Sequence, residues 1–389
     1  IQNGSGTLIL TGTNGYTGVT TISAGTLKIG NGGTNGSFGN GIITNNATLT
    51  FNRSDTISVT NRISGSGSLI QVGPGTLALY GANNYSGITT ISAGTLLVNG
   101  LLGTNHTTVA ANATLGGSGH ISGLVTISAG GMFSPGNNGL GTLTISNNLV
   151  LGGNALMAVS KTGSVTTNDV AFVTGVLTEG GTLIVTNIGV SALASGDSFK
   201  LFNAATYAGT SFATLTLPAL ATGLYWNTNL LATSGILSVT NFTFTLNYSA
   251  GANGSLSGST TQIVNYAASG SPVTPTANTG YYFANWSDSG TANPRTDTNV
   301  TANLSVTANF AVLVPATFSG NLTVSGNQLQ FTFSGVSGEP YKILTAPDLT
   351  IPLTNWLIVS SGIFGNDPVT FTNNLAPDST NGYFRITSP

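Results

Sequence analysis

One stretch of 27 residues occurs twice in this chain of 389 residues and constrains its fold more than any other feature. Repeat A, residues 4–30, reads GSGTLILTGTNGYTGVTTISAGTLKIG, and repeat B, residues 73–99, reads GPGTLALYGANNYSGITTISAGTLLVN. The repeats align without a gap at 17 identical positions and are offset by 69 residues. A period of this order is typical of stacked repeat architectures. Because the repeats consist mainly of Gly, Thr, Ser, Asn and isolated aliphatic residues, they favour a structural role over a chemical one.

Short runs of apolar residues and Thr, separated by Gly and Asn, predict an all-β fold for residues 1–241. Residues 7–10, 26–29 and 47–51 are examples of such runs. Thr, Val and Ile suit a pleated surface, whereas frequent Gly opposes a helix. The 69-residue offset divides into three coils of about 23 residues and favours a parallel β-solenoid over a sandwich of hairpins. Some 240 residues would then form roughly ten rungs and a rod on the order of 50 Å long.

The repeated phrase G-x-G-T-L-x-L-x-G-x-N-x-Y-x-G-x-T-T-I-S-A-G-T-L resembles the autotransporter-associated β-strand repeat, also called the passenger-associated transport repeat. Residues 112–123, 128–136 and 141–145 continue the pattern, so the resemblance covers about residues 4–150. It implies a secreted, right-handed β-helix on the outside of a bacterium. Residues 151–241 keep the strand pattern without the phrase, and we expect them to close the end of the solenoid, since an open rung exposes strand edges.

Two small β domains are expected after the solenoid. Residues 242–314 contain Gly-Tyr-Tyr-Phe-Ala-Asn-Trp at 280–286 and a closing strand at 305–310, a pattern similar to the extracellular β-repeats related to the internalin B-repeat. Those modules are spacers or adhesive units of surface proteins. Residues 315–389, beyond a linker at 313–316, resemble the C-terminal β-sandwich modules that end many large secreted proteins of environmental bacteria.

Charge excludes several classes of partner. Only 5% of the residues are charged, with 8 Lys+Arg and 10 Asp+Glu and a net charge of −2. Nucleic acids and anionic membrane surfaces bind clustered Lys and Arg, and no run of 18 or more apolar residues occurs. We therefore expect no nucleic-acid partner and no membrane insertion. A net charge near zero favours association between protein molecules.

Catalysis by paired carboxylates is the first chemical alternative, because parallel β-helices include polysaccharide lyases and hydrolases. Residues 1–241 contain only Asp55, Asp169, Glu179 and Asp197 as carboxylates. Asp169 and Glu179 could meet across strands, but no Asp cluster with a nearby basic residue appears, and glycoside hydrolysis requires two carboxyls about 5–10 Å apart. We expect these residues to be solvated turn carboxylates, and we assign no catalytic residue.

Metal and cofactor sites are not expected either. His106 and His120 have no Cys or carboxylate companion, and the chain contains no Cys. The glycine-rich turns lack the Asp of a Ca²⁺-binding repeat, and the turn at residues 297–299 has too few ligands for a Ca²⁺ site. No helix follows the glycine-rich turns, so they do not form a dinucleotide fingerprint.

Aromatic residues of the second module are the candidate binding residues. Tyr281, Tyr282 and Trp286 could stack on a surface glycan or contact another partner, and Trp356 with Tyr383 offers the same chemistry in the third module. A buried aromatic core is the favoured interpretation of all five, because these residues alternate with polar positions.

The sequence favours a non-enzymatic, extracellular structural protein of a bacterial surface. Its low charge and its exposed first rung predict a self-assembling fibre, in which copies of the chain associate head to tail. Ile1, Leu8 and Leu10 are the residues expected at the self-association end. An adhesin or glycan-binding surface module is the alternative function. A polysaccharide-degrading β-helix enzyme is a third possibility, disfavoured by the missing acid cluster.

Overall fold

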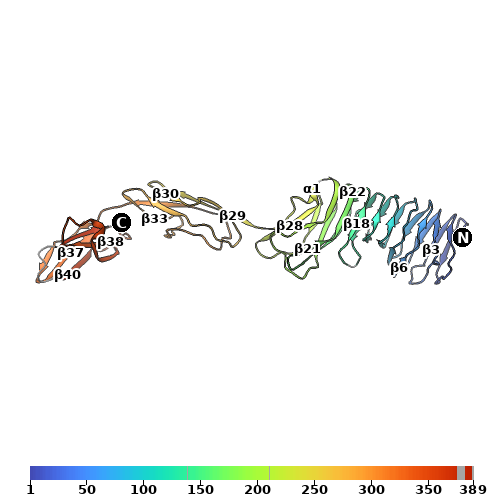
Figure 1. Ribbon diagram of the computed structural model, residues 1–389, viewed down its shortest axis with the longest axis horizontal. Coiled ribbons are helices and arrows are strands. Elements are labelled where there is room, and N and C mark those ends of the chain that lie inside the picture. The colour runs from blue at the N-terminus through green and yellow to red at the C-terminus, as the bar shows by residue number, and fades with distance from the viewer. Residues whose placement is uncertain (138, 210, 375–381, 388–389) are drawn as a thin grey trace. The chain divides into compact units, whose positions relative to one another are not determined.

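The computed structural model describes residues 1–137, 139–209, 211–374 and 382–387, and the regular secondary structure of this part of the chain is almost entirely β-strand (Figure 1). The chain divides into two compact units, Ile1–Phe242 and Thr243–Pro389. Across the described ranges, no helix is long and apolar enough to cross a membrane.

Unit 1 is a parallel β-solenoid, as the sequence predicts, and its strands stack one behind another (Figure 1). The described strands repeat in a three-sided order. Face 1 carries ten of them in parallel register. They are β1 (Thr7–Leu10), β3 (Thr26–Ile29), β5 (Thr48–Phe51), β8 (Ser68–Gln71), β10 (Thr89–Ile91), β13 (Thr107–Val109), β16 (Val125–Ile127), β19 (Leu149–Leu151), β22 (Val170–Thr178) and β25 (Phe202–Ala208).

Faces 2 and 3 complete each rung. Face 2 consists of β2 (Thr20–Ile22), β4 (Ile43–Asn45), β7 (Ile63–Ser64), β12 (Leu101–Leu102), β15 (His120–Ile121) and β18 (Thr142–Ile145). Face 3 consists of β6 (Thr56–Val59), β9 (Thr76–Leu79), β11 (Gly94–Val98), β14 (Ala113–Gly117), β17 (Met132–Pro135), β20 (Asn154–Thr162), β23 (Thr182–Asn187) and β26 (Thr214–Thr216), while β21 (Val165–Asn168) pairs antiparallel with β20. The long β22 pairs with both β18 and β19, so it joins faces 1 and 2.

The expected division of the 69-residue offset into three whole rungs is wrong. On face 1, Thr7 pairs with Thr26, Thr26 with Thr48 and Thr48 with Ser68, so the first three rungs take 19, 22 and 20 residues. The remaining residues carry the chain past face 1, and Thr76, the counterpart of Thr7, lies on face 3. Repeat B is therefore displaced by one face relative to repeat A. The repeated sequence therefore specifies a succession of strands and corners without specifying a face. It can form on any of the three faces, because the strands of each face alternate inward and outward side chains.

Local chemistry explains the strands and corners of the repeats. In Thr-Leu-x-Leu the two leucines lie two residues apart, so both point to the same side of a strand. In repeat B both are completely buried, as Leu77 and Leu79. The Ser-Ala-Gly turn ends in a left-handed residue in both repeats, with φ of 66° at Gly25 and 64° at Gly94, a conformation that favours glycine.

The far end of the solenoid is closed, as expected. Helix α1 (Leu231–Ser234) and the antiparallel strands β24 (Ser198–Lys200), β27 (Leu224–Asn227) and β28 (Ile236–Asn241) follow the last rungs. The Leu201 N–H donates to the Gly235 carbonyl at 2.9 Å, and Leu231 and Leu237 are buried in the same hydrophobic core as the rungs. This cap covers the aliphatic column that would otherwise face water.

Unit 2 contains two separate hydrophobic clusters. The first lies among β29 (Thr243–Ala250), β30 (Gly254–Ser257), β31 (Thr261–Asn265), β32 (Thr274–Ala277), β33 (Tyr281–Trp286) and β34 (Leu304–Val312). The second lies among β35 (Thr317–Phe318), β36 (Thr323–Ser325), β37 (Gln328–Ser334), β38 (Pro340–Ala346), the 3₁₀ turn Leu353–Asn355, β39 (Leu357–Ile363), β40 (Val369–Asn374) and β41 (Tyr383–Thr387). The first cluster packs Tyr248 and Trp286 among aliphatic residues, whereas aromatic rings dominate the second.

Candidate functional site

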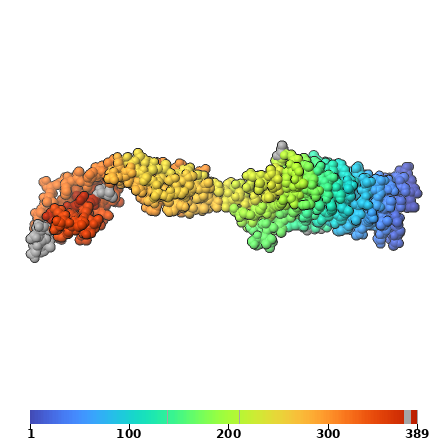
Figure 2. All heavy atoms as spheres, turned by 45° about the horizontal axis from the view of Figure 1, so that its top comes forward, coloured from blue at the N-terminus to red at the C-terminus, as the bar shows by residue number. Residues whose placement is uncertain are grey.

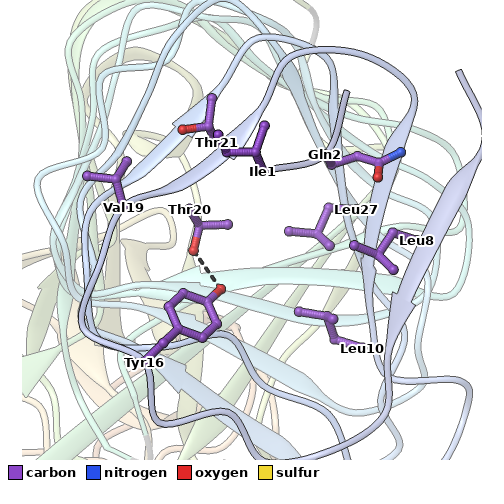
Figure 3. A pocket seen from close by; sticks show the side chains of 9 residues that line it. All are labelled: Ile1, Gln2, Leu8, Leu10, Tyr16, Val19, Thr20, Thr21 and Leu27. Atoms are coloured by element: carbon purple, nitrogen blue, oxygen red, sulfur yellow. Dashed lines mark hydrogen bonds between the residues drawn. The ribbon is translucent and has the colours of Figure 1, made fainter. Parts of the chain in front are cut away.

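A hollow of about 300 Å³ lies at the N-terminal end of the solenoid, where the first rung has no neighbour on its outer side (Figure 3). Figure 2 shows this end of unit 1 in blue. We call this surface the open end. It is lined by Ile1, Gln2, Leu8, Leu10, Tyr16, Val19, Thr20, Thr21 and Leu27.

The three residues predicted for the self-association end all line this hollow. Ile1 is 85% exposed and Leu8 is 43% exposed, while Leu10 is half-buried. In Figure 3, Leu8, Leu10 and Leu27 gather on the β1 side of the hollow, and Tyr16 and Val19 lie across from them. The sequence prediction missed Tyr16 and Val19, which widen the apolar lining.

Hydrogen bonds hold the polar groups of the open end in place. The hydroxyls of Tyr16 and Thr20 share a hydrogen bond of 2.7 Å. The Gln2 Nε2 donates to the carbonyl oxygens of Gly4 and Gly6, at 2.9 Å and 3.1 Å. These side chains satisfy one another or the local backbone, so the lining that remains available to a partner is mainly aliphatic and aromatic.

Repeat B contains the same arrangement in a covered form. The hydroxyls of Tyr85 and Thr89 share a hydrogen bond of 2.7 Å, and Gln71 Nε2 donates to the carbonyls of Gly73 and Gly75. Tyr85 is completely buried, whereas its counterpart Tyr16 is 40% exposed. Burial raises the pKa of the Tyr85 hydroxyl above its usual value of 10.

The rung before repeat B accounts for this difference. On face 3, Ile57 pairs with Leu77 and Val59 pairs with Leu79. On face 1, β1 stands at the end of the sheet and pairs with β3 on one side only. The open end is therefore the uncovered version of a surface that the same chain covers elsewhere with aliphatic side chains.

The aromatic candidates of the second module divide into one core residue and two surface residues. Trp286 is completely buried, packs edge to face against Tyr248 and Phe283, and donates from Nε1 to the Ala292 carbonyl at 2.9 Å. It has no free ring face for a glycan in this conformation. Tyr281 and Tyr282, on the edge strand β33, are half-buried and keep part of their surface in solvent.

The expectation that Asp169 and Glu179 are solvated is wrong, because both are buried. Asp169 accepts hydrogen bonds from the backbone N–H groups of Gly141 and Ala158, at 2.9 Å and 2.7 Å, and so ties a corner to a strand. Both carboxyl oxygens of Glu179 lack a hydrogen-bond partner. Burial raises the pKa of Glu179 from 4.5 to about 7.

Other polar candidates have structural partners. Asp297 pairs with Arg295 at 2.7 Å and accepts a hydrogen bond from Tyr248, so its turn is an ion-pair cluster. Imidazole Nε2 of His106 lies 3.0 Å from the Thr126 hydroxyl, and Nε2 of His120 lies 2.6 Å from the Ser146 hydroxyl. Within the described ranges, no three His, Cys, Asp or Glu side chains group as metal ligands.

Comparison with protein families confirms both resemblances that the sequence suggested for the solenoid and the second module. Residues 1–29 and 69–98 match the passenger-associated-transport-repeat, and residues 244–313 match the divergent InlB B-repeat domain. The chain thus carries both kinds of repeat. The resemblance of residues 315–389 stays a prediction.

A curated protein with a related sequence is the adhesin BmaC autotransporter of Brucella suis biovar 1 (strain 1330). It is 52% identical over 66 residues, which are 17% of this chain. The matched segment spans about 2% of the length of that adhesin.

Proposed function

We propose that this chain is a structural protein of a bacterial surface, exposed to the outside and without catalytic activity. The observation that carries the proposal is the pair of passenger-associated transport repeats in the solenoid. The B-repeat module and the short segment shared with an autotransporter adhesin support the same placement. A stack of rungs with a continuous aliphatic core provides length and rigidity and needs no ligand.

Accessibility on intact cells tests this proposal. Cells that produce the chain are treated with an external protease or with an antibody against unit 1, and lysed cells serve as the reference. Surface exposure predicts that the chain is cleaved or labelled on intact cells while a cytoplasmic marker is protected. A chain that is protected until lysis contradicts the proposal.

The finer proposal is that the protein assembles with itself, and the open end is its contact surface. The lining is mainly aliphatic and aromatic and carries no charged side chain, and the hollow lies beside the edge strand of a sheet that stacks strands throughout unit 1. A filament requires two contacts that do not close on each other. Negative-stain imaging at high protein concentration separates filaments from closed pairs and from single particles.

Adhesion is the second candidate function, favoured by the segment shared with an adhesin and by the half-exposed Tyr281 and Tyr282. Aromatic side chains at an exposed strand edge bury large area at little conformational cost. A glycan array is the direct test. Binding that the double variant Tyr281→Ala/Tyr282→Ala abolishes, without loss of fold, supports adhesion through this edge. Binding that the variant retains excludes these two residues.

A further inference from the structure

We propose that the carboxyl group of Glu179 is a pH switch that controls the closure of β25 and β26, the last strands of faces 1 and 3. The protonated carboxyl lets these strands close over the preceding rung, and the ionised carboxylate releases them. This inference goes beyond the proposed surface function and does not depend on it.

Glu179 lies inside the stack, at the corner that connects β22 to β23. Side chains alternate along a strand, so Glu179 continues the inward row of Leu177, which is completely buried. In the preceding rung, Leu149 pairs with Leu177, and the same register brings the buried Leu151 alongside Glu179. The carboxyl group therefore stands at the margin of the aliphatic core.

The carboxyl group of Glu179 is buried without the partners that a buried charge needs. The residue is only 7% exposed, and neither carboxyl oxygen has a hydrogen-bond partner among the described residues. Asp169, which is also buried, accepts two hydrogen bonds from backbone N–H groups. A carboxylate removed from water without such bonds is strongly destabilised relative to the neutral acid. Burial accordingly raises the pKa of Glu179 from 4.5 to about 7.

No neighbouring strand supplies a charge that would offset this burial. The titratable side chain that faces Glu179 is Tyr207 on β25, whose hydroxyl donates to the Phe202 carbonyl at 2.9 Å and accepts from the Ala204 N–H at 3.2 Å. Burial raises the pKa of Tyr207, and the charge of Glu179 adds to the increase, so this phenol stays neutral around pH 7. Strands β19, β22, β23 and β26 contain no charged residue.

The strands that cover Glu179 are held by few buried contacts. The Glu179 N–H donates to the Ala208 carbonyl at 3.1 Å, and a Cβ on Gly209 would meet the Glu179 carbonyl oxygen at 2.9 Å, so the end of β25 lies directly against this corner. Strand β26 stands at the end of the described face 3 sheet, pairs with β23, and has all three residues exposed. Such segments open locally at a low free-energy cost. Release of β25 and β26 can therefore hydrate an ionised Glu179 while the rest of the stack stays folded.

The size of the effect follows from the two pKa values. In the closed stack Glu179 keeps its proton up to about pH 7, whereas in the open form its carboxyl titrates at the ordinary value of 4.5. The advantage of the closed form is therefore complete below pH 4.5 and is lost as the pH rises through 7. The ratio of open to closed molecules increases by up to roughly 300-fold across this interval, which is ten raised to the difference between the two pKa values.

A direct titration of Glu179 is the first test. The chain contains two glutamates, Glu179 and Glu339, so ¹³C labelling of glutamate carboxyl groups gives two resonances in the full chain. The variant Glu179→Gln removes one of them and so assigns both. We expect the Glu179 resonance to titrate with a midpoint near pH 7. A midpoint near 4.5 would show a solvated carboxylate and would overturn the proposal.

Hydrogen exchange of the full chain at pH 5 and pH 8, corrected for intrinsic exchange rates, measures the opening itself. Protection of peptides from β25 and β26 should fall more than about tenfold at the higher pH, while repeat B should keep its protection. Glu179→Gln and Glu179→Met should both abolish this fall, because neither side chain ionises. Tyr207→Phe is the matched control: it removes the facing titratable group and should retain the fall. Protection that is independent of pH in the parent chain, or a fall that persists in both Glu179 variants, refutes the switch. An equal fall in repeat B would indicate unfolding of the whole stack and would also overturn it.

Discussion

Repeats A and B allow one substitution to be made twice in the same local structure. Leu8 and Leu77 occupy the same place in Thr-Leu-x-Leu, but Leu77 is completely buried and Leu8 is 43% exposed. Replacing a buried Leu by Ala costs about 2–5 kcal/mol, because it removes apolar contact and leaves a cavity. At Leu8 water fills the vacated space, so no cavity forms, and only about half of the hydrophobic free energy of the side chain is lost. We therefore expect Leu8→Ala to cost about 1 kcal/mol.

Thermal and urea unfolding of the full chain, followed by circular dichroism at low protein concentration, measure the two costs. A difference of about 2–3 kcal/mol corresponds to a difference of roughly 5–10 °C in the midpoint of a unit of this size. Hydrogen exchange on peptides that cover residues 4–30 and 73–99 reports local opening of each repeat separately. We expect repeat A to exchange faster than repeat B in the unsubstituted chain.

Equal destabilisation by Leu8→Ala and Leu77→Ala in dilute solution would refute the reasoning, since it would mean that the first rung is covered in the monomer. A larger cost of Leu8→Ala at high concentration than at low concentration is the expected sign of the proposed self-association. The control is Leu77→Ala, whose cost should not depend on concentration.

Three further predictions concern Glu179, Trp286 and Gly94. Because the pKa of Glu179 is raised from 4.5 in the unfolded chain to about 7 in the fold, the folded protein keeps a proton that the unfolded chain releases, and stability falls as pH rises from 4.5 to 7. Above pH 7, Glu179→Gln should recover up to about 3 kcal/mol of the lost free energy of unfolding, and below pH 4.5 it should change stability little. Urea midpoints measured across this pH range test the prediction. Identical pH profiles of the variant and the parent would contradict it. Trp286→Ala should lower the free energy of unfolding by about 3–5 kcal/mol and make the second module susceptible to limited proteolysis, because Trp286 is completely buried. Tyr281→Ala should leave the module resistant to the protease. A Trp286→Ala variant that stays folded and resistant would argue against a core role for this residue. Gly94→Ala should destabilise the fold by more than about 1 kcal/mol, measured as a lower unfolding midpoint. The reason is that φ is 64° at Gly94 and a Cβ there would meet the carbonyl oxygens of Gly73 and Gly75. Gly6→Ala is the matched control, because a Cβ at Gly6 meets open space.

Much of the fold could be predicted from local patterns. Alternation of apolar residues with Thr, Asn and Gly identifies strands and corners, because the side chains of a strand alternate between its two sides. The rung length could not be derived in the same way. Thr7 and Thr76 stand in the same local sequence, yet they lie on different faces. The lengths of the corners between them decide which face each position reaches, and local sequence does not reveal those lengths.

The candidate site was predicted in part. Ile1, Leu8 and Leu10 follow from the idea of an exposed first rung, but Tyr16 and Val19 lie beyond the first strand, in the segment that connects β1 to β2. Their counterparts Tyr85 and Ile88 were visible in the alignment of the repeats and are the signal that could have found them. Trp286 was ambiguous for another reason: alternation along a strand does not reveal which of its sides is covered.

The burial of Glu179 could not be predicted from composition or local sequence. The sequence around it, Leu-Thr-Glu-Gly-Gly, has the glycines of a solvated turn, but the following rung covers the carboxyl and leaves it without a partner. Burial of a charged group depends on residues that are distant in sequence, here those near Tyr207 and Gly209.

The sequence by itself determined the strand chemistry, the stacked repeat and the near absence of charge, because each of these depends only on residue type and short-range order. Tertiary structure decided which of two nearly identical phrases is buried. Tyr16 and Tyr85 each share a hydrogen bond with the equivalent threonine four residues later, yet Tyr16 is 40% exposed and Tyr85 is completely buried. The difference is the presence of a neighbouring rung, since burial in a solenoid is a property of the stack and not of the repeat.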